Sequence, residues 1–189
     1  DNLGLITSRQ QSQSGEWALV GVANSLLESC AISNKTREIN YTFPLYLYPS
    51  TDAVQQRSLL DTSPWPPDPA HGNRTPNLAP AFVAEMEAKL GLRFAPFGPE
   101  SADTFGPEDV FHYIYAVLHS PTYRARYAEF LKIDFPRVPL ASNVALFRAL
   151  AGLGAELVGL HLLESPAVRA LATRYPVAGD NQVARGHPR

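Results

Sequence analysis

Short apolar runs separated by polar stretches occupy the first part of the chain. Residues 3–8 form one such run, residues 17–22 a second, and residues 39–48 a third that is rich in aromatic and β-branched side chains. In the third run, one strand face is predicted from residues at every second position, Tyr41, Phe43, Leu45 and Leu47. Pro44 interrupts it and predicts an edge position or a bulge. The pattern therefore predicts a β-rich region over residues 1–49.

Six prolines stand between residues 49 and 76, among Ser, Asp, Asn and Gly. Proline lacks the N–H that helices and strand ladders need, so this composition predicts an irregular segment. We expect a Pro-rich loop or linker over residues 50–76.

The hydrophobic period then changes to three or four residues, which is typical of helices. Five helices are predicted where a cap residue or a first-turn proline precedes such a run, at Thr75–Pro76, Pro107, Ser120–Pro121, Ser142 and Ser165–Pro166. Gly91 is expected to end the first helix, and the fifth should run to about Arg174. On the third helix, the spacing of Tyr123, Tyr127 and Phe130 predicts core positions.

The predicted fold class is therefore α+β, with a small N-terminal β-sheet region followed by a predominantly helical bundle. The helical part is expected over residues 77–175. Residues 176–189 are turn-rich and have no closing element, which we interpret as a truncated end.

Composition restricts the protein class. The chain has 189 residues, of which 45% are hydrophobic. We see no apolar run of the roughly 18 residues that a membrane span needs, and expect no membrane partner. The lone Cys30 and the lack of a secretory signal at the N-terminus favour the cytoplasm. The net charge of −2 is not typical of a nucleic-acid binder, although residues 111–189 carry nine Lys or Arg against five Asp or Glu.

No complete catalytic motif is visible. Gly152 and Gly154 lie within a predicted helix and lack the preceding strand of a phosphate loop. Cys30 has no histidine close to it in sequence, so no nucleophile triad is predicted. His112 and His119 share a helix face at a spacing wider than that of the usual zinc pair, which favours packed or hydrogen-bonded histidines and no metal.

Binding chemistry remains. Two polar loops adjoin predicted strands and carry side chains that pair with bases or phosphates, and a helical segment mixes arginines with tyrosines. The candidate DNA-binding residues are Arg9, Gln10, Gln11, Ser12, Ser14, Lys35, Thr36, Arg37, Asn40, Arg124 and Arg126. The alternative is that the loops are only solvated, and that the arginines pair with acidic groups.

Longer strings resemble a known family. Asn2–Gln10 (NLGLITSRQ), Thr42–Pro49 (TFPLYLYP) and Phe111–Pro121 (FHYIYAVLHSP) are similar to the C-terminal specificity region of type ISP restriction-modification enzymes. Tyr123–Tyr127 and Leu131–Pro139 follow in the order that the family shows. The resemblance extends from Asn2 to about Asn181, and versions of the third string occur in related phage-defence adenine methyltransferases.

That family joins a nuclease, an ATP-driven translocase, an N6-adenine methyltransferase and a target-recognition domain in one polypeptide. The resemblance implies that this chain is the non-catalytic recognition part, which holds duplex DNA and helps present the target adenine to the methyltransferase. S-adenosylmethionine, ATP and Mg²⁺ would then bind to the other domains. A second hypothesis is a structural coupling module, in which the helical part packs against the methyltransferase and translocase domains without reading bases.

Overall fold

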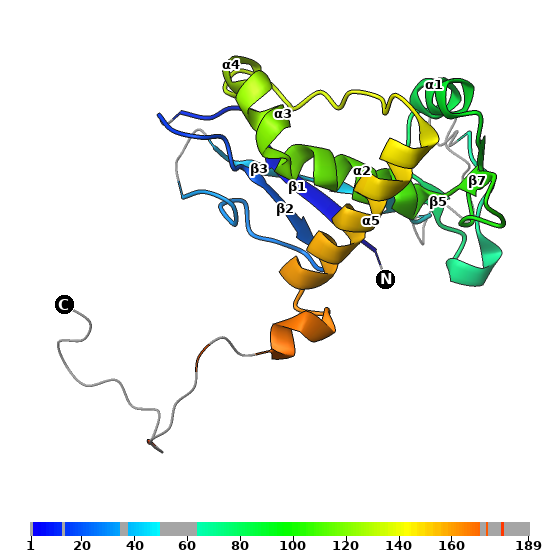
Figure 1. Ribbon diagram of the computed structural model, residues 1–189. Coiled ribbons are helices and arrows are strands. Elements are labelled where there is room, and N and C mark those ends of the chain that lie inside the picture. Colours follow the sequence, from blue (N-terminus) through cyan, green and yellow to red (C-terminus); the bar gives the residue numbers. More distant parts are fainter. Residues whose placement is uncertain are drawn as a thin grey trace.

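The N-terminal part of the chain forms a three-stranded antiparallel sheet in the computed structural model, which describes residues 2–12, 14–34, 38–49 and 64–170, together with Thr173 and Gly179. The strands are β1 (Gly4–Ser8), β2 (Val20–Ala23) and β3 (Asn40–Pro44), in the spatial order β2-β1-β3. Helices lie across this sheet (Figure 1). The small N-terminal β-sheet expected from the sequence is confirmed.

One face of the sheet contributes to the hydrophobic core. Leu5 lies opposite Val22 on one side and Phe43 on the other, so these three side chains share a face. Leu5 and Val22 pack against the core cluster, together with the buried Val20. The β1 and β2 side of this face therefore packs against the core, while Phe43 on β3 stays 43% exposed.

The prediction for Pro44 is confirmed, because β3 is an edge strand and ends at that residue. The prediction of one continuous strand face beyond it is wrong. After Pro44 the chain enters a separate strand, β4 (Tyr46–Leu47), which pairs with β5 (Thr75–Pro76). Leu45, between the two strands, is buried, whereas the other three residues of the expected face are exposed.

The predominantly helical remainder is also confirmed. It contains α1 (Pro80–Leu90), α2 (Pro107–His119), α3 (Pro121–Arg126), α4 (Ala128–Leu131) and α5 (Val144–His161), with short 3-10 helices η1 (Pro69–His71) and η2 (Pro166–Arg169). A short parallel pair, β6 (Arg93–Phe94) and β7 (Thr104–Phe105), lies between α1 and α2.

Several helix ends follow the sequence signals. Gly91 ends α1 in the left-handed conformation, with φ of 65°, and its N–H donates to the Glu87 carbonyl oxygen. Ser120 caps α3 by accepting from the Tyr123 N–H, and Ser165 caps η2 in the same way. Glu108 and Asp109 stand in the first turn of α2, as expected, and Asp109 accepts from the Gly106 N–H.

Other predicted ends are wrong. The first helix starts at Pro80, because Thr75–Pro76 is extended and pairs with β4. Asn143, not Ser142, caps α5, since its Oδ1 accepts from the Leu146 N–H at 2.9 Å. The fifth helix is only a 3-10 turn that ends at Arg169.

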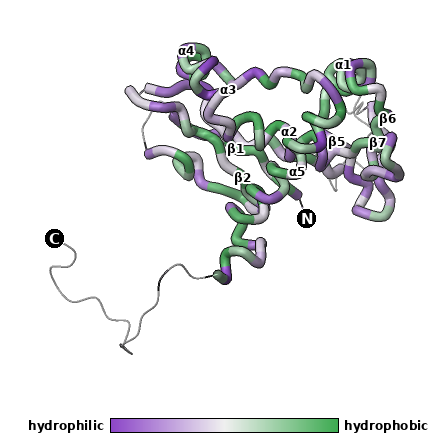
Figure 2. The backbone as a smooth tube through the Cα atoms, viewed as in Figure 1, coloured by the Kyte–Doolittle hydropathy of each residue, from purple (hydrophilic) through white to green (hydrophobic). Residues whose placement is uncertain are grey.

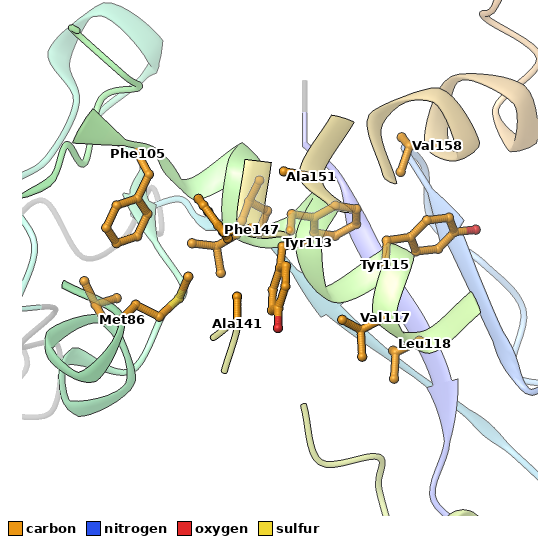
Figure 3. Packing of buried hydrophobic residues seen from close by; sticks show 14 of the residues in the cluster. Met86, Phe105, Tyr113, Tyr115, Val117, Leu118, Ala141, Phe147, Ala151 and Val158 are labelled. Carbon is orange, nitrogen blue, oxygen red and sulfur yellow. The ribbon is translucent and has the colours of Figure 1, made fainter. Parts of the chain in front are cut away.

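The core is centred on the crossing of α2 and α5 (Figure 1). Figure 3 shows Tyr113 and Phe147 side by side at this crossing, with Phe105 and Met86 toward α1 and with Val158 near Tyr115. Tyr113 and Phe147 are both fully buried, and their ring centroids are 5.4 Å apart. The packing of these aromatic rings contributes to holding the two helices together.

Gly154 determines how closely these helices approach. A Cβ atom at this position would collide with the carbonyl oxygen of His112 on α2. Gly152, two residues earlier, has no atom within 4 Å of its would-be Cβ. The glycine pair is therefore no phosphate loop, as the sequence predicts, and Gly154 serves helix packing.

Residues 64–76 are packed onto the rest of the protein. The Trp65 indole N–H donates to the Leu78 carbonyl oxygen at 2.9 Å, and the Arg74 guanidinium lies 3.7 Å from the centroid of the Tyr46 ring. Residues 50–63 lie outside the described residues, so the linker over residues 50–76 stays a prediction.

Helix α5 is long and apolar enough, by length and composition, to cross a membrane. The expectation that no segment approaches such a length is therefore wrong. The helix carries Arg148 and Glu156, and its buried residues Phe147, Ala151, Gly154 and Val158 lie on one face. That face packs against α2, as in the core helix of a globular protein.

Candidate nucleic-acid interface

Three separate parts of the chain meet at one end of the sheet. Because β1 and β3 are antiparallel and Ser8 lies opposite Asn40, the loop after β1 and the loop before β3 emerge together. The segment after α4 joins them, since the Gln11 N–H donates to the Lys132 carbonyl oxygen at 3.1 Å. We call residues 9–12, Ser33, Glu38 and 126–139 the loop end.

Glu38 links the two loops predicted from the sequence. It is 3% exposed, and its Oε1 accepts from both the N–H and the hydroxyl of Ser12, at 2.7 and 2.8 Å. Its Oε2 accepts from the Ser33 hydroxyl at 2.5 Å. A buried carboxylate with charge-assisted hydrogen bonds is a strong structural connector, so the two loops are positioned relative to each other.

The candidates of the first loop lie on the surface with partly engaged side chains. Arg9 and Asp134 form an exposed ion pair, with 3.2 Å between Nε and Oδ1. Gln10 and Ser14 are exposed, and Gln11 donates through Nε2 to the Gly15 carbonyl oxygen. Exposed ion pairs contribute little to stability, which leaves Arg9 available for an anionic partner.

The environment of Asp134 favours the ionised carboxylate that pairs with Arg9. A hydrogen bond from the Phe135 backbone N–H, and then the one from Arg9, lower the pKa of its carboxyl group. The carboxylate is therefore ionised near neutral pH, and it orients Arg9 across the loop end.

The second loop gives a different result. Lys35, Thr36 and Arg37 lie outside the described residues. Asn40 is buried, and its Oδ1 accepts from the Ala31 N–H at 2.9 Å while its own N–H donates to the Ser29 carbonyl oxygen. Its amide oxygen is therefore used to fix residues 29–31 to β3.

The two arginines of α3 have separate roles. Arg124 is partly buried. Its Nε donates to the Leu118 carbonyl oxygen at 2.7 Å, and its Nη2 lies 3.2 Å from His119 Nδ1. The expectation that it pairs with an acidic group is wrong, because its closest partners are the last turn of α2 and a histidine. Arg126 is exposed, and its side chain has no hydrogen bond or ion pair with any residue that the structure describes.

Tyr123 and Tyr127 pack as predicted, with ring centroids 5.0 Å apart. Phe130 does not. It is 70% exposed, so the prediction that it belongs to the core is wrong. Helix α3 ends at Arg126 and the chain restarts as α4, which rotates Leu131 into the core and Phe130 out of it.

Sequence reasoning missed the segment after α4. Ile133 is 64% exposed, and Phe135 packs edge-on against Tyr41 and Phe43 of β3. Ile133 and Phe135, together with Phe130 and Tyr123, border an apolar groove of about 510 Å³ that extends to Pro139. The sequence did contain a signal for this segment. From Leu131 to Phe135, apolar and charged residues alternate, and this spacing does not fit a helix.

The loop end carries four cationic side chains and three carboxylates. The cations are Arg9, Arg126, Lys132 and Arg137. The carboxylates are Glu129 and Asp134 at the surface and Glu38, which is buried. Lys132 pairs with Glu129 at 2.9 Å. Figure 2 shows hydrophilic residues interspersed with hydrophobic ones around α3 and α4, in contrast to the hydrophobic centre of the molecule.

A histidine cluster lies behind this surface. Tyr115 Oη and His161 Nδ1 are 2.5 Å apart, and the rings of His119 and His161 have centroids 5.2 Å apart. Burial, and then the nearby Arg124 and His161, lower the pKa of His119 to about 4. Burial raises the pKa of Tyr115 to about 12. Both groups are neutral near pH 7 and hydrogen-bonded, as expected for packed residues.

Across the described ranges, no group of three or more His, Cys, Asp or Glu side chains could hold a metal ion.

Comparisons with known proteins place these features in a family. No curated protein matches the chain. A chain in a cryo-EM structure of a DrdV–DNA complex is similar to 85% of this chain, with 25% identity and a TM-score of 0.54. The match spans 12% of the length of that solved chain. The family model of the type ISP C-terminal specificity domain matches residues 1–187, and this protein therefore belongs to that family.

Proposed function

We propose that this protein reads a short asymmetric sequence of duplex DNA for a type ISP restriction-modification enzyme, and so contributes to phage defence. The observation that carries the proposal is the match of nearly the whole chain to a specificity domain. The similar solved chain comes from a complex with DNA, which supports the same partner.

The loop end is the surface that suits this role best. It combines unpaired cations with exposed polar side chains on loops that a rigid sheet positions. Cations supply affinity for phosphates, and Arg, Gln and Ser side chains pair with base edges. We therefore assign phosphate contacts to Arg126 and Arg137, and base contacts to Arg9 and Gln10 of the loop end and to Ser14, which follows it in the same loop.

The parent enzyme would supply the chemistry. In this proposal a separate methyltransferase domain binds S-adenosylmethionine, and translocase and nuclease domains use ATP and Mg²⁺, all in the cytoplasm. The present chain would hold the duplex so that the target adenine can leave the base stack and enter the methyltransferase site.

The test is binding of this chain to a pool of random duplexes, at low and at moderate salt, with the bound fraction sequenced. An enriched short motif is the expected result. Affinity should also fall steeply with salt, because Lys and Arg release counterions from phosphates. Salt-dependent binding without any motif would contradict base reading, and absence of binding would contradict the proposal as a whole.

A second candidate function is structural coupling, and one observation favours it. Leu146, Leu153 and Leu160 are exposed at seven-residue spacing along α5, which places them on one side of the helix. Such a stripe would suit packing against the methyltransferase or translocase domain. A protein that acts only in this way should bind no DNA in the pool experiment.

A further inference from the structure

We propose that Phe130 and Ile133 form an apolar wedge that inserts between base pairs of the duplex and kinks it at the loop end. This inference rests on the proposed DNA-reading function and adds a mechanism to it. Phe130 is 70% exposed and Ile133 is 64% exposed, whereas Leu131 between them is 1% exposed. The buried leucine anchors the end of the short helix α4, Phe130 is exposed on that helix, and Ile133 is exposed in the turn that follows it.

Hydrogen bonds fix the backbone before and after the wedge. The Leu131 N–H donates to the Tyr127 carbonyl oxygen at 3.0 Å, and the Ile133 N–H donates to that of Phe130 at 3.1 Å. Below it, the Tyr123 hydroxyl donates to the Arg137 carbonyl oxygen at 2.8 Å. Insertion requires side chains that are positioned before binding, because ordering them on binding would cost conformational entropy.

Cations surround the wedge. Arg126 lies four residues before Phe130, Lys132 lies between the two wedge residues, and Arg137 lines the same groove as both of them. The side chains of Arg126 and Arg137 have no hydrogen bond or ion pair within the described part of the chain. A polyanion could therefore bind to Arg126 and Arg137 without breaking an ion pair of either side chain, whereas Lys132 is already paired with Glu129.

The charge pattern selects DNA as the occupant. Proteins that kink DNA insert Phe, Leu, Ile or Met between base steps, and use neighbouring cations to hold the phosphates. The groove beside the wedge is mainly apolar and has one cation, Arg137, and one carboxylate, Asp134, in its lining. A protein segment that docks on the same groove would make Phe130 irrelevant to DNA, and is one outcome of the test.

The test measures bending of a duplex of about 30 base pairs that carries a donor and an acceptor fluorophore at its two ends. A protein-induced kink of roughly 20–90° brings the ends closer and raises energy transfer. The full chain should raise the transfer at saturation. Phe130→Ala and Ile133→Ala should each abolish that rise and weaken binding by about tenfold.

Three further variants separate the possible outcomes. Phe130→Trp retains a large apolar ring and should restore bending. Arg126→Ala should weaken binding while the saturated complex remains bent, and Leu153→Ala, an exposed leucine of α5, should change neither quantity. Circular dichroism checks that each variant is folded.

The other possible results show whether the wedge fails alone or together with the proposed DNA binding. If the unaltered chain binds the duplex without bending it, or if Phe130→Ala and Ile133→Ala bend it as before, the wedge is overturned and DNA binding stands. If both variants bind and bend the duplex as the unaltered chain does, Phe130 and Ile133 are instead a contact site for a protein partner. If the unaltered chain does not bind at all, the proposed function fails, and the wedge with it.

Discussion

The α2–α5 pair and the loop end use the same kinds of residue in opposite ways. Between α2 and α5, aromatic rings are buried, and a glycine removes the side chain that would separate the helices. At the loop end, Phe130 and Ile133 face solvent beside unpaired arginines. Because these apolar side chains stay exposed, they do not contribute buried surface to the stability of this chain. Their position among cations indicates a surface that binds a partner.

Buried charge follows the same division. Near the helix pair, burial keeps His119 and Tyr115 neutral. At the loop end, the buried Glu38 is surrounded by donors that connect two loops. One region therefore provides stability, and the other positions side chains; the following variants test that separation.

The largest effect is expected at the helix crossing. Gly154→Ala should lower the free energy of unfolding by about 3 kcal/mol or more, because the new methyl group collides with the His112 carbonyl oxygen and the helices must separate. Gly152→Ala is the matched control and should raise stability by about 0.5–1 kcal/mol, since alanine favours helix and the site is open. Urea unfolding measures both. Equal effects of the two substitutions would refute the close approach of α2 and α5.

The next effect concerns the connection between the loops. Glu38→Ala should leave two serine hydroxyls and the Ser12 N–H without their acceptor, at a cost of about 1–3 kcal/mol. Hydrogen exchange should show faster exchange in both loops, with weaker DNA binding. Glu28→Ala, which removes a carboxylate that accepts from the Ser29 hydroxyl and the Cys30 N–H, is the control. Unchanged exchange at Ser12 would mean that Glu38 does not connect the loops.

The two arginines of α3 should separate stability from binding. Arg124→Ala should lower the free energy of unfolding by about 1–3 kcal/mol, because it removes the donor to the last turn of α2. Arg126→Ala should leave stability unchanged, weaken DNA binding a few-fold and reduce the salt slope by about one. Thermal unfolding and binding titrations over a salt series measure the two effects. The comparison breaks if Arg126→Ala unfolds the protein or Arg124→Ala leaves its stability unchanged.

The smallest effect concerns pH. The pKa of His119 is about 4 in the folded protein and near 6.5 in an unfolded chain, so the unfolded state binds more protons between these values. Stability should be fully present above pH 6.5 and fall progressively toward pH 4. His119→Gln should reduce this slope without abolishing it, because burial also lowers the pKa of His112. Urea midpoints at several pH values test the slope, and an identical slope in the variant would place the titrating group elsewhere.

Local sequence signals predicted much of the fold. Alternation predicted the sheet, and proline after a capping residue predicted the starts of α3 and η2, because these signals act within a few residues. The start of α1 was mispredicted for a non-local reason. Thr75–Pro76 has the same signal, but its backbone pairs with β4, almost thirty residues earlier in the chain.

The candidate site was predicted only in part. Polar loops were correctly located in sequence, yet nothing local distinguishes Asn40, which is buried and bonded to Ala31, from the exposed Gln10. Arg124 and Arg126 are two residues apart and chemically identical, and only packing separates a buried donor from an exposed cation. Phe130 was assigned to the core because helical spacing assumes that the helix continues.

By itself, the sequence determined the class of the fold and the order of most elements, because these depend on short-range patterns of residues. It also determined the family, because long stretches of the sequence are characteristic of that family. The tertiary structure decided which side chains are available to a partner. Glu38 lies close to Ser12 although it is 26 positions further along the chain, and the carbonyl oxygen of Lys132, directly after α4, accepts from the Gln11 N–H. Such contacts depend on how sheet and helices pack, and the spacing of residues along the chain carries no record of them.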